Sequence, residues 1–69
     1  MTNVIKKGID KAGTLFRLIK ERNEVYDLTM YCIEYAKRSE DFTLWYECKS
    51  FGWTDNGKRA MSVFNRIIA

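Results

Sequence analysis

The shortness of the chain limits the fold most, because 69 residues have to build a hydrophobic core without covalent help. Below about 70–80 residues, a single core rarely supplies more than 3–5 kcal/mol, and small domains usually add disulfides or a metal. Cys32 and Cys48 are the only cysteines, they form no C-x-x-C pair, and His is absent. We therefore expect one domain over residues 1–69, a cytoplasmic location with both thiols reduced, and neither a metal nor a cofactor.

Aromatic residues are the main resource for a core in this chain. Four Phe, four Tyr and two Trp are present, and each buries on the order of 150–250 Å² when packed. No apolar run approaches the roughly 20 residues of a membrane-spanning helix, so no span is expected. The absence of Pro is compatible with long helices.

Apolar residues recur mainly at spacings of three to five positions, which is typical of amphipathic helices. This pattern predicts an all-α fold, a small bundle of four helices over residues 2–22, 24–38, 40–51 and 54–69. Gly8 lies on the apolar side of the first helix, where we expect another backbone to come close. The expected core residues are Ile9, Phe16, Leu28, Cys32, Leu44, Trp45, Phe64 and Ile67.

Two segments also fit strands. Residues 25–33 have a strand-like composition, and residues 42–48 alternate between apolar and polar side chains. The alternative fold is therefore α+β, with short strands near 25–33 and 42–48. We favour a helix over 40–51 because Ser39 is a good N-cap and Gly52 a good residue to follow the C-cap.

Charge is distributed unevenly along the chain. Residues 1–22 hold six basic and two acidic side chains, net +4, and residues 53–69 hold three and one, net +2. The intervening residues 23–52 hold three basic and six acidic side chains, net −3. Such an asymmetry steers a charged partner, or it is matched within the fold or within a dimer.

The side chains of common enzyme chemistry are missing. Without His, the chain lacks imidazole acid–base chemistry and the usual catalytic triads. The four glycines form neither a dinucleotide-binding fingerprint nor a P-loop. A bundle of this size also leaves little volume for a substrate pocket. We therefore expect no enzymatic activity.

An aromatic surplus beside basic helices predicts a protein-binding function, because Tyr, Trp and Arg most often carry binding energy at interfaces. The chain is expected to regulate or inhibit a larger macromolecular partner by stoichiometric association. In size and composition alone, it is similar to the accessory proteins that phages and mobile elements use against host factors. The partner surface is expected to be acidic, and a homodimer is also compatible with the surplus. The expected partner-binding residues are Tyr31, Trp45, Tyr46, Trp53, Arg59 and Arg66.

Nucleic-acid binding is the alternative function. The last helix has a basic polar face, and the segment before it gives a helix-turn-helix outline. The match is poor in detail, because Glu47 and Lys58 fall where such a motif has apolar packing residues. The residues expected to contact nucleic acid are Lys58, Arg59, Ser62, Asn65 and Arg66.

Overall fold

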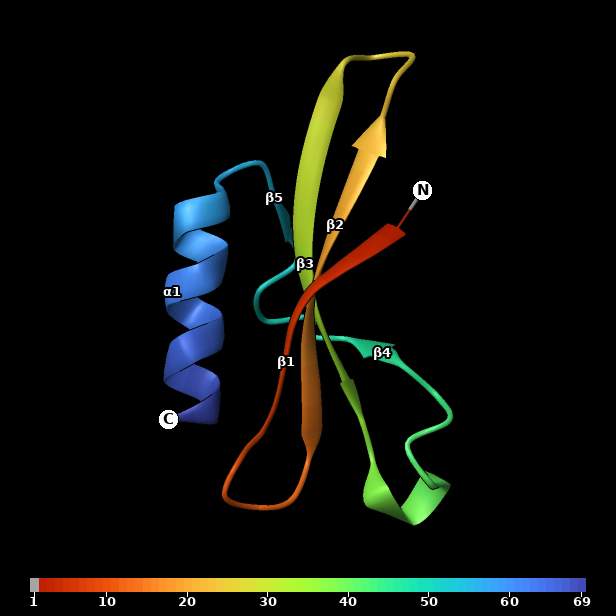
Figure 1. Ribbon diagram of the computed structural model, residues 1–69, viewed down its shortest axis with the longest axis vertical. Coiled ribbons are helices and arrows are strands. Elements are labelled where there is room, and N and C mark those ends of the chain that lie inside the picture. The colour runs from red at the N-terminus through yellow and green to blue at the C-terminus, as the bar shows by residue number, and fades with distance from the viewer. Residues whose placement is uncertain (1) are drawn as a thin grey trace.

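The computed structural model describes residues 2–69 and consists of one antiparallel sheet with one helix packed on a single face (Figure 1). A short 3₁₀ helix, Arg38–Glu40, follows the third strand. Strands β4 and β5 both pair with the edge of β3 that faces away from β2. The expected all-α bundle of four helices is therefore wrong. The elements are β1 (Thr2–Ile9), β2 (Leu15–Asn23), β3 (Leu28–Ala36), β4 (Tyr46–Glu47), β5 (Trp53–Thr54) and α1 (Gly57–Ile68).

The β1–β2 hairpin replaces the helix predicted over residues 2–22. Asp10 Oδ1 accepts hydrogen bonds from the backbone N–H groups of Ala12 and Thr14, at 3.0 and 2.9 Å. Gly13 adopts a φ of +84°, which costs glycine little and other residues more. These residues reverse the chain, so β2 runs back antiparallel to β1.

The apolar side chains on both faces of β2 explain why the spacing in this segment is typical of a helix. Leu18 faces α1, and Phe16, on the same side of the strand, packs beside it. Leu15 and Ile19 alternate with them and therefore face the opposite side of the sheet. Because both faces carry apolar side chains, the period of two is lost, and the remaining spacings of three and four positions match a helix.

The second and third predicted helices are also wrong. Residues 24–38 form the β2–β3 turn, all of β3 and the start of the 3₁₀ helix, and residues 40–51 form mostly loop around β4. Asn23 Oδ1 fixes the β2–β3 turn by accepting from the backbone N–H groups of Val25 and Tyr26, at 3.0 and 3.3 Å. The alternative with strands near 25–33 and 42–48 overlaps β3 and β4 but misses β1 and β2.

The last predicted helix is present as α1, which begins at Gly57 rather than at residue 54. Asn56 is its N-cap, and the Asn56 Oδ1 atom accepts from the Arg59 N–H at 3.1 Å. Within residues 2–69, no helix has both the length and the apolar character needed to cross a membrane.

The core lies between α1 and the sheet. Leu18 and Ile33, paired across β2 and β3, pack against Ala60 and Phe64 of α1, and all four are buried. Of the expected core residues, Cys32 and Phe64 are buried, Phe16, Trp45 and Ile67 are half-buried, and Ile9, Leu28 and Leu44 are exposed.

Two glycines let α1 approach the sheet. A Cβ atom on Gly8 would stand 2.7 Å from Ile68 Cδ1, so the close neighbour expected there is a side chain rather than a backbone. A Cβ atom on Gly57 would stand 2.9 Å from Cζ of the Tyr31 ring. Tyr31 therefore packs under the first turn of the helix, and Ile68 packs on β1 near the other end.

We expect Gly57→Ala to destabilise the fold by about 1–3 kcal/mol, because its Cβ would overlap a packed aromatic ring. Helix propensity alone predicts the opposite sign, a gain of about 1 kcal/mol. Urea unfolding followed by circular dichroism measures the difference. The matched control is Ser62→Ala on the exposed side of the same helix, and a stabilised Gly57→Ala protein would contradict the packing.

Candidate functional site

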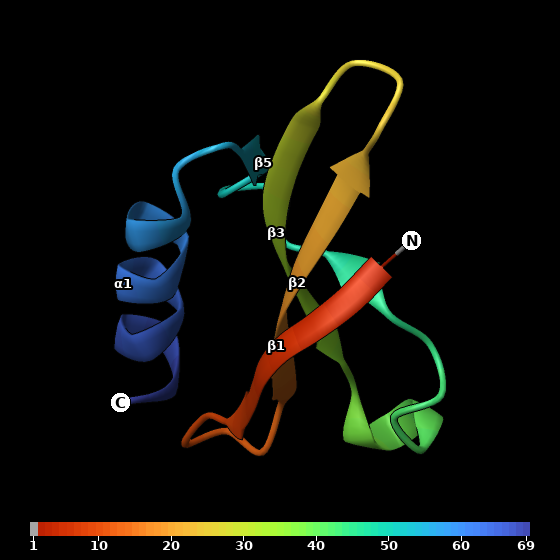
Figure 2. The ribbon, with the colours of Figure 1, turned by 45° about the horizontal axis from the view of Figure 1, so that its top comes forward.

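The sheet has two unlike faces because only one of them is packed against α1. Figure 2 shows the helix along one side of the strands, while the loop that joins β3 to β4 lies on the other side. We call the side of β1–β3 turned away from the helix the uncovered face. Residues that are paired across the strands share a face, so the strand register defines which side chains lie there.

An apolar row crosses the middle of the uncovered face. Val4 pairs with Ile19, Ile19 pairs with Cys32, and Cys32 pairs with Trp53, so the row spans β1, β2, β3 and β5. Ile19 and Cys32 in the centre are 3% and 0% exposed, whereas Val4 and Trp53 at the ends are 43% and 40% exposed. The row therefore has a packed centre and two accessible hydrophobic ends.

A charged row runs beside the apolar row and consists of Lys7, Arg17, Glu34 and Glu47, one from each of β1–β4. Arg17 Nε donates to Glu34 Oε1 at 2.7 Å, and Arg17 Nη2 lies 2.6 Å from the same oxygen in an ion pair. Its guanidinium also lies 4.0 Å from the ring centroid of Trp45. This stacking holds Trp45 against the uncovered face.

A shallow hollow of about 260 Å³ opens on the same face next to Trp53. Its other lining residues are Glu21, Asn23 and Met30. Glu21 pairs directly with Met30, and Met30 is two residues along β3 from Cys32, the partner of Trp53. An indole, a carboxylate, a carboxamide and a thioether therefore meet at one place.

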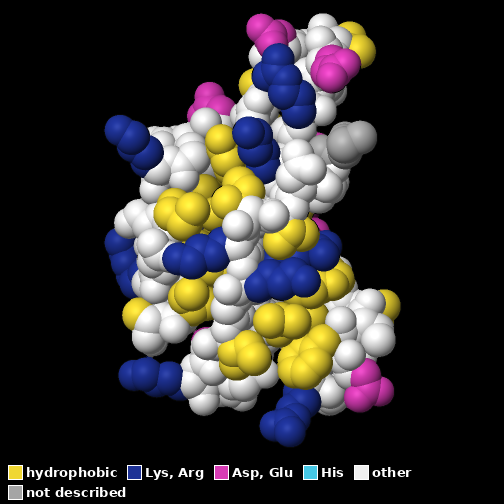
Figure 3. Space-filling model, viewed as in Figure 1, with side chains coloured by type: hydrophobic (Ala, Val, Ile, Leu, Met, Phe, Trp, Pro, Cys, Tyr) yellow, Lys and Arg dark blue, Asp and Glu magenta, His cyan; other side chains and the backbone are white. Residues whose placement is uncertain are grey.

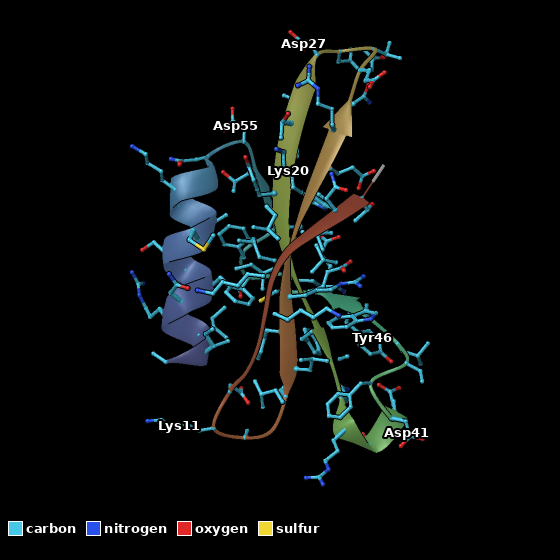
Figure 4. All side chains as sticks on the ribbon, viewed as in Figure 1. Lys11, Lys20, Asp27, Asp41, Tyr46 and Asp55 are labelled. Atoms are coloured by element: carbon cyan, nitrogen blue, oxygen red, sulfur yellow. The ribbon has the colours of Figure 1, made fainter. Side chains whose placement is uncertain are left out.

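The outer side of α1 forms a second surface, which is basic. Lys6 of β1 reaches it and donates to Asn65 Oδ1 at 2.7 Å. Figure 3 shows Lys and Arg side chains along the α1 side of the molecule, and Figure 4 places Lys11 near the end of that helix. We call this surface the basic helix surface. The residues predicted to bind nucleic acid, Lys58, Arg59, Ser62, Asn65 and Arg66, are all exposed on it.

The structure does not gather the predicted partner-binding residues into one site. Trp53 and Trp45 belong to the uncovered face, whereas Arg59 and Arg66 lie on the basic helix surface. Tyr31 packs between α1 and the sheet and so belongs to neither surface. The aromatic and arginine side chains that were expected to act together are therefore on opposite sides of the sheet.

Tyr46 has a structural environment of its own. Its ring stacks on Tyr35 with 5.5 Å between centroids, and its hydroxyl donates to Glu40 Oε2 at 2.7 Å. The hydrogen bond to Glu40 is the main cause that raises the pKa of Tyr46. These contacts anchor the loop between β3 and β4, so Tyr46 supports the fold at this edge.

The helix-turn-helix outline is also wrong. Residues 41–56, directly before α1, contain β4, a turn and β5 and no helix, so no helix in that segment positions α1 across a nucleic-acid backbone. Any contact between α1 and a nucleic acid would therefore use a helix supported by a sheet.

Neither cysteine forms a disulfide, and the two differ in environment. Cys32 is fully buried, and burial is the main cause that raises its pKa to about 12, with the Glu47 and Glu34 carboxylates adding to the effect. Cys48 is half-buried. Within residues 2–69, no group of three or more His, Cys, Asp or Glu side chains is placed to hold a metal ion.

We expect the stability of the wild-type protein to fall as the pH rises from the ordinary thiol pKa of 9.0 towards about 12. Over that window the unfolded chain loses the Cys32 proton and the folded chain keeps it, whereas below it both states are protonated. Urea unfolding at several pH values should show that Cys32→Ala loses less stability at alkaline pH than the wild-type protein does. A thiol reagent at pH 8 should label only Cys48 in the folded protein, and rapid native labelling of Cys32 would contradict its burial.

Comparisons with protein-family models, with curated proteins and with solved structures find no match for this chain. Proposals about what the protein binds therefore rest on the chemistry of the uncovered face and of the basic helix surface.

Proposed function

We propose that this protein is a non-catalytic binding module that regulates or inhibits a larger protein by stoichiometric association through its uncovered face. The apolar row carries this proposal. Its exposed ends, Val4 and Trp53, are large hydrophobic side chains on a preformed sheet, and Trp is among the residues that most often anchor interfaces.

The geometry of the uncovered face supports recognition of a protein rather than a substrate. Exposed apolar side chains lie at the ends of the apolar row and further along the same face, and exposed apolar surface of this kind marks interaction sites. The charged row gives the face a polarity, from Lys7 and Arg17 on β1 and β2 to Glu34 and Glu47 on β3 and β4. A partner with complementary charges would be held in one orientation. The further exposed hydrophobic residues of this face are Ile9 and Leu28.

Free thiols are compatible with action in a reducing compartment such as the cytoplasm. Cys32 lies in the centre of the apolar row and is not crosslinked. Disulfides are rare in cytosolic proteins, so two unpaired cysteines suit that setting.

Binding of nucleic acid by the basic helix surface is the second candidate function. It is favoured by the Lys6–Asn65 hydrogen bond, which joins a lysine from β1 to the polar face of α1. No acidic residue lies within α1, so its cations could neutralise phosphates without internal competition. The uncovered face exposes more hydrophobic side chains than the basic helix surface does, so protein binding is the preferred proposal.

Affinity capture from a lysate of the cells in which the protein acts separates the two functions. The immobilised wild-type protein should retain one dominant protein after nuclease treatment, and Trp53→Ala should weaken that capture about 30-fold, as expected for an interface anchor. Arg66→Ala, on the opposite side of the sheet, is the matched control and should retain it.

The opposite pattern would contradict the proposal. If capture is sensitive to nuclease, falls steeply with added salt and is lost in Arg66→Ala but not in Trp53→Ala, the basic helix surface binds nucleic acid instead. Circular dichroism of each variant verifies that the sheet is intact.

A further inference from the structure

The hollow beside Trp53 has the chemistry of a cation site. The carboxylate of Glu21 supplies negative charge, the Trp53 indole supplies an aromatic face, and Met30 supplies a polarisable wall between them. The strand register pairs Glu21 with Met30 and places Met30 diagonal to Trp53, and all three side chains line the hollow.

The surrounding charges favour the same kind of ligand. Glu24 and Asp27 lie in the adjoining β2–β3 turn, and Figure 4 shows Asp27 at the end of that hairpin. Arg22 is engaged with Thr29 and Asp27 and belongs to the opposite side of β2 from Glu21. Within residues 2–69, Glu21 makes no ion pair, and its hydrogen-bond partner is the Thr2 hydroxyl at 3.5 Å.

The size of the hollow indicates a single side chain. Its volume of about 260 Å³ falls below the roughly 300–1,000 Å³ of pockets that enclose small molecules. The hollow is also shallow and adjoins the apolar row, so a side chain that projects from a docked polypeptide can enter it.

We infer that this hollow receives an arginine side chain of the partner protein, with the guanidinium stacked on the Trp53 indole and paired with the Glu21 carboxylate. Arginine suits the site better than lysine because its planar guanidinium is weakly hydrated and stacks on aromatic rings.

This inference changes the expected chemistry of the partner. The sequence placed Trp53 beside Arg59 and Arg66 and therefore predicted an acidic partner surface. In the structure, Trp53 lines the same hollow as Glu21 and lies across the sheet from both arginines. The partner surface that complements the exposed Trp53 indole is therefore expected to be basic where it meets the hollow. The inference rests on the proposed protein-binding function and names the group that the uncovered face recognises.

A capped arginine, N-acetyl-arginine methylamide, tests the hollow without the partner. In ¹⁵N-resolved NMR titrations of the whole protein, the Trp53 indole N–H resonance should shift saturably while the Trp45 resonance stays in place. Capped citrulline, which has nearly the same shape but no charge, should bind about tenfold more weakly. Equal shifts with citrulline, or no saturable shift with arginine, would overturn the inference.

Two variants separate the carboxylate from its neighbours. Glu21→Gln should weaken the binding of capped arginine about tenfold, whereas Glu24→Gln, in the same hairpin but outside the hollow, should weaken it by less than about twofold, since its charge acts only at long range. An equal loss in both variants would overturn the site, because it would show only attraction to a generally acidic hairpin.

The outcome is distinct from that of the capture experiment. If Trp53-dependent capture succeeds and capped arginine does not bind, the arginine inference is wrong and the proposed function stands. If capped arginine binds and Trp53→Ala leaves capture unchanged, the hollow is real and the proposed function is wrong.

Discussion

The docking of a single helix on one side of the sheet determines the rest of the structure. Phe64 and Ala60 of α1 close over Leu18 and Ile33, and these four buried residues form the centre of the core. Gly57 and Gly8 permit the close contacts with Tyr31 and Ile68 near the two ends of the helix. Since residues 2–69 contain no second α-helix, the opposite face of the sheet is covered only by loops and by its own long side chains.

That division explains how the two surfaces differ. The side of α1 turned from the core carries Lys58, Arg59 and Arg66 without a carboxylate, so it is basic and hydrated. Apolar and charged rows alternate on the uncovered face, because in these rows the strand register pairs apolar residues with apolar residues and charged residues with charged residues. Its two tryptophans differ accordingly: Trp45 is fixed by Arg17, whereas Trp53 remains accessible beside the hollow.

The edge of β1 is a less suitable docking site than the uncovered face. It is unpaired along its outer side, but the register shifts between Val4 and Lys6, and two adjacent lysines stand at the middle of the strand. A bulge and edge lysines are devices that prevent strands from pairing between molecules. The surplus hydrophobic surface that suggested a homodimer therefore lies on the face of the sheet rather than along its edge.

The sequence predicted α1 because its apolar positions follow a helical period, but it placed the start at residue 54, whereas the helix begins at Gly57 after the Asn56 cap. It failed over β1–β3, where both faces of β2 carry apolar residues and the alternation that identifies a strand is masked. Asp10 with Gly13, and Asn23 with Asp27, were the available turn signals, and Asp27 indeed adopts a positive φ. Of the candidate site, composition identified Trp53, but Glu21 and Met30 come together only through strand register.

Photocrosslinking from single positions tests most directly whether the uncovered face is the binding surface. A benzophenone side chain placed at Val4, on the apolar row, should give one discrete protein adduct that survives nuclease and is competed by unlabelled wild-type protein. The same group at Ser62, on the basic helix surface, should give none. An adduct from Ser62 with none from Val4 would contradict the account and transfer the function to the helix.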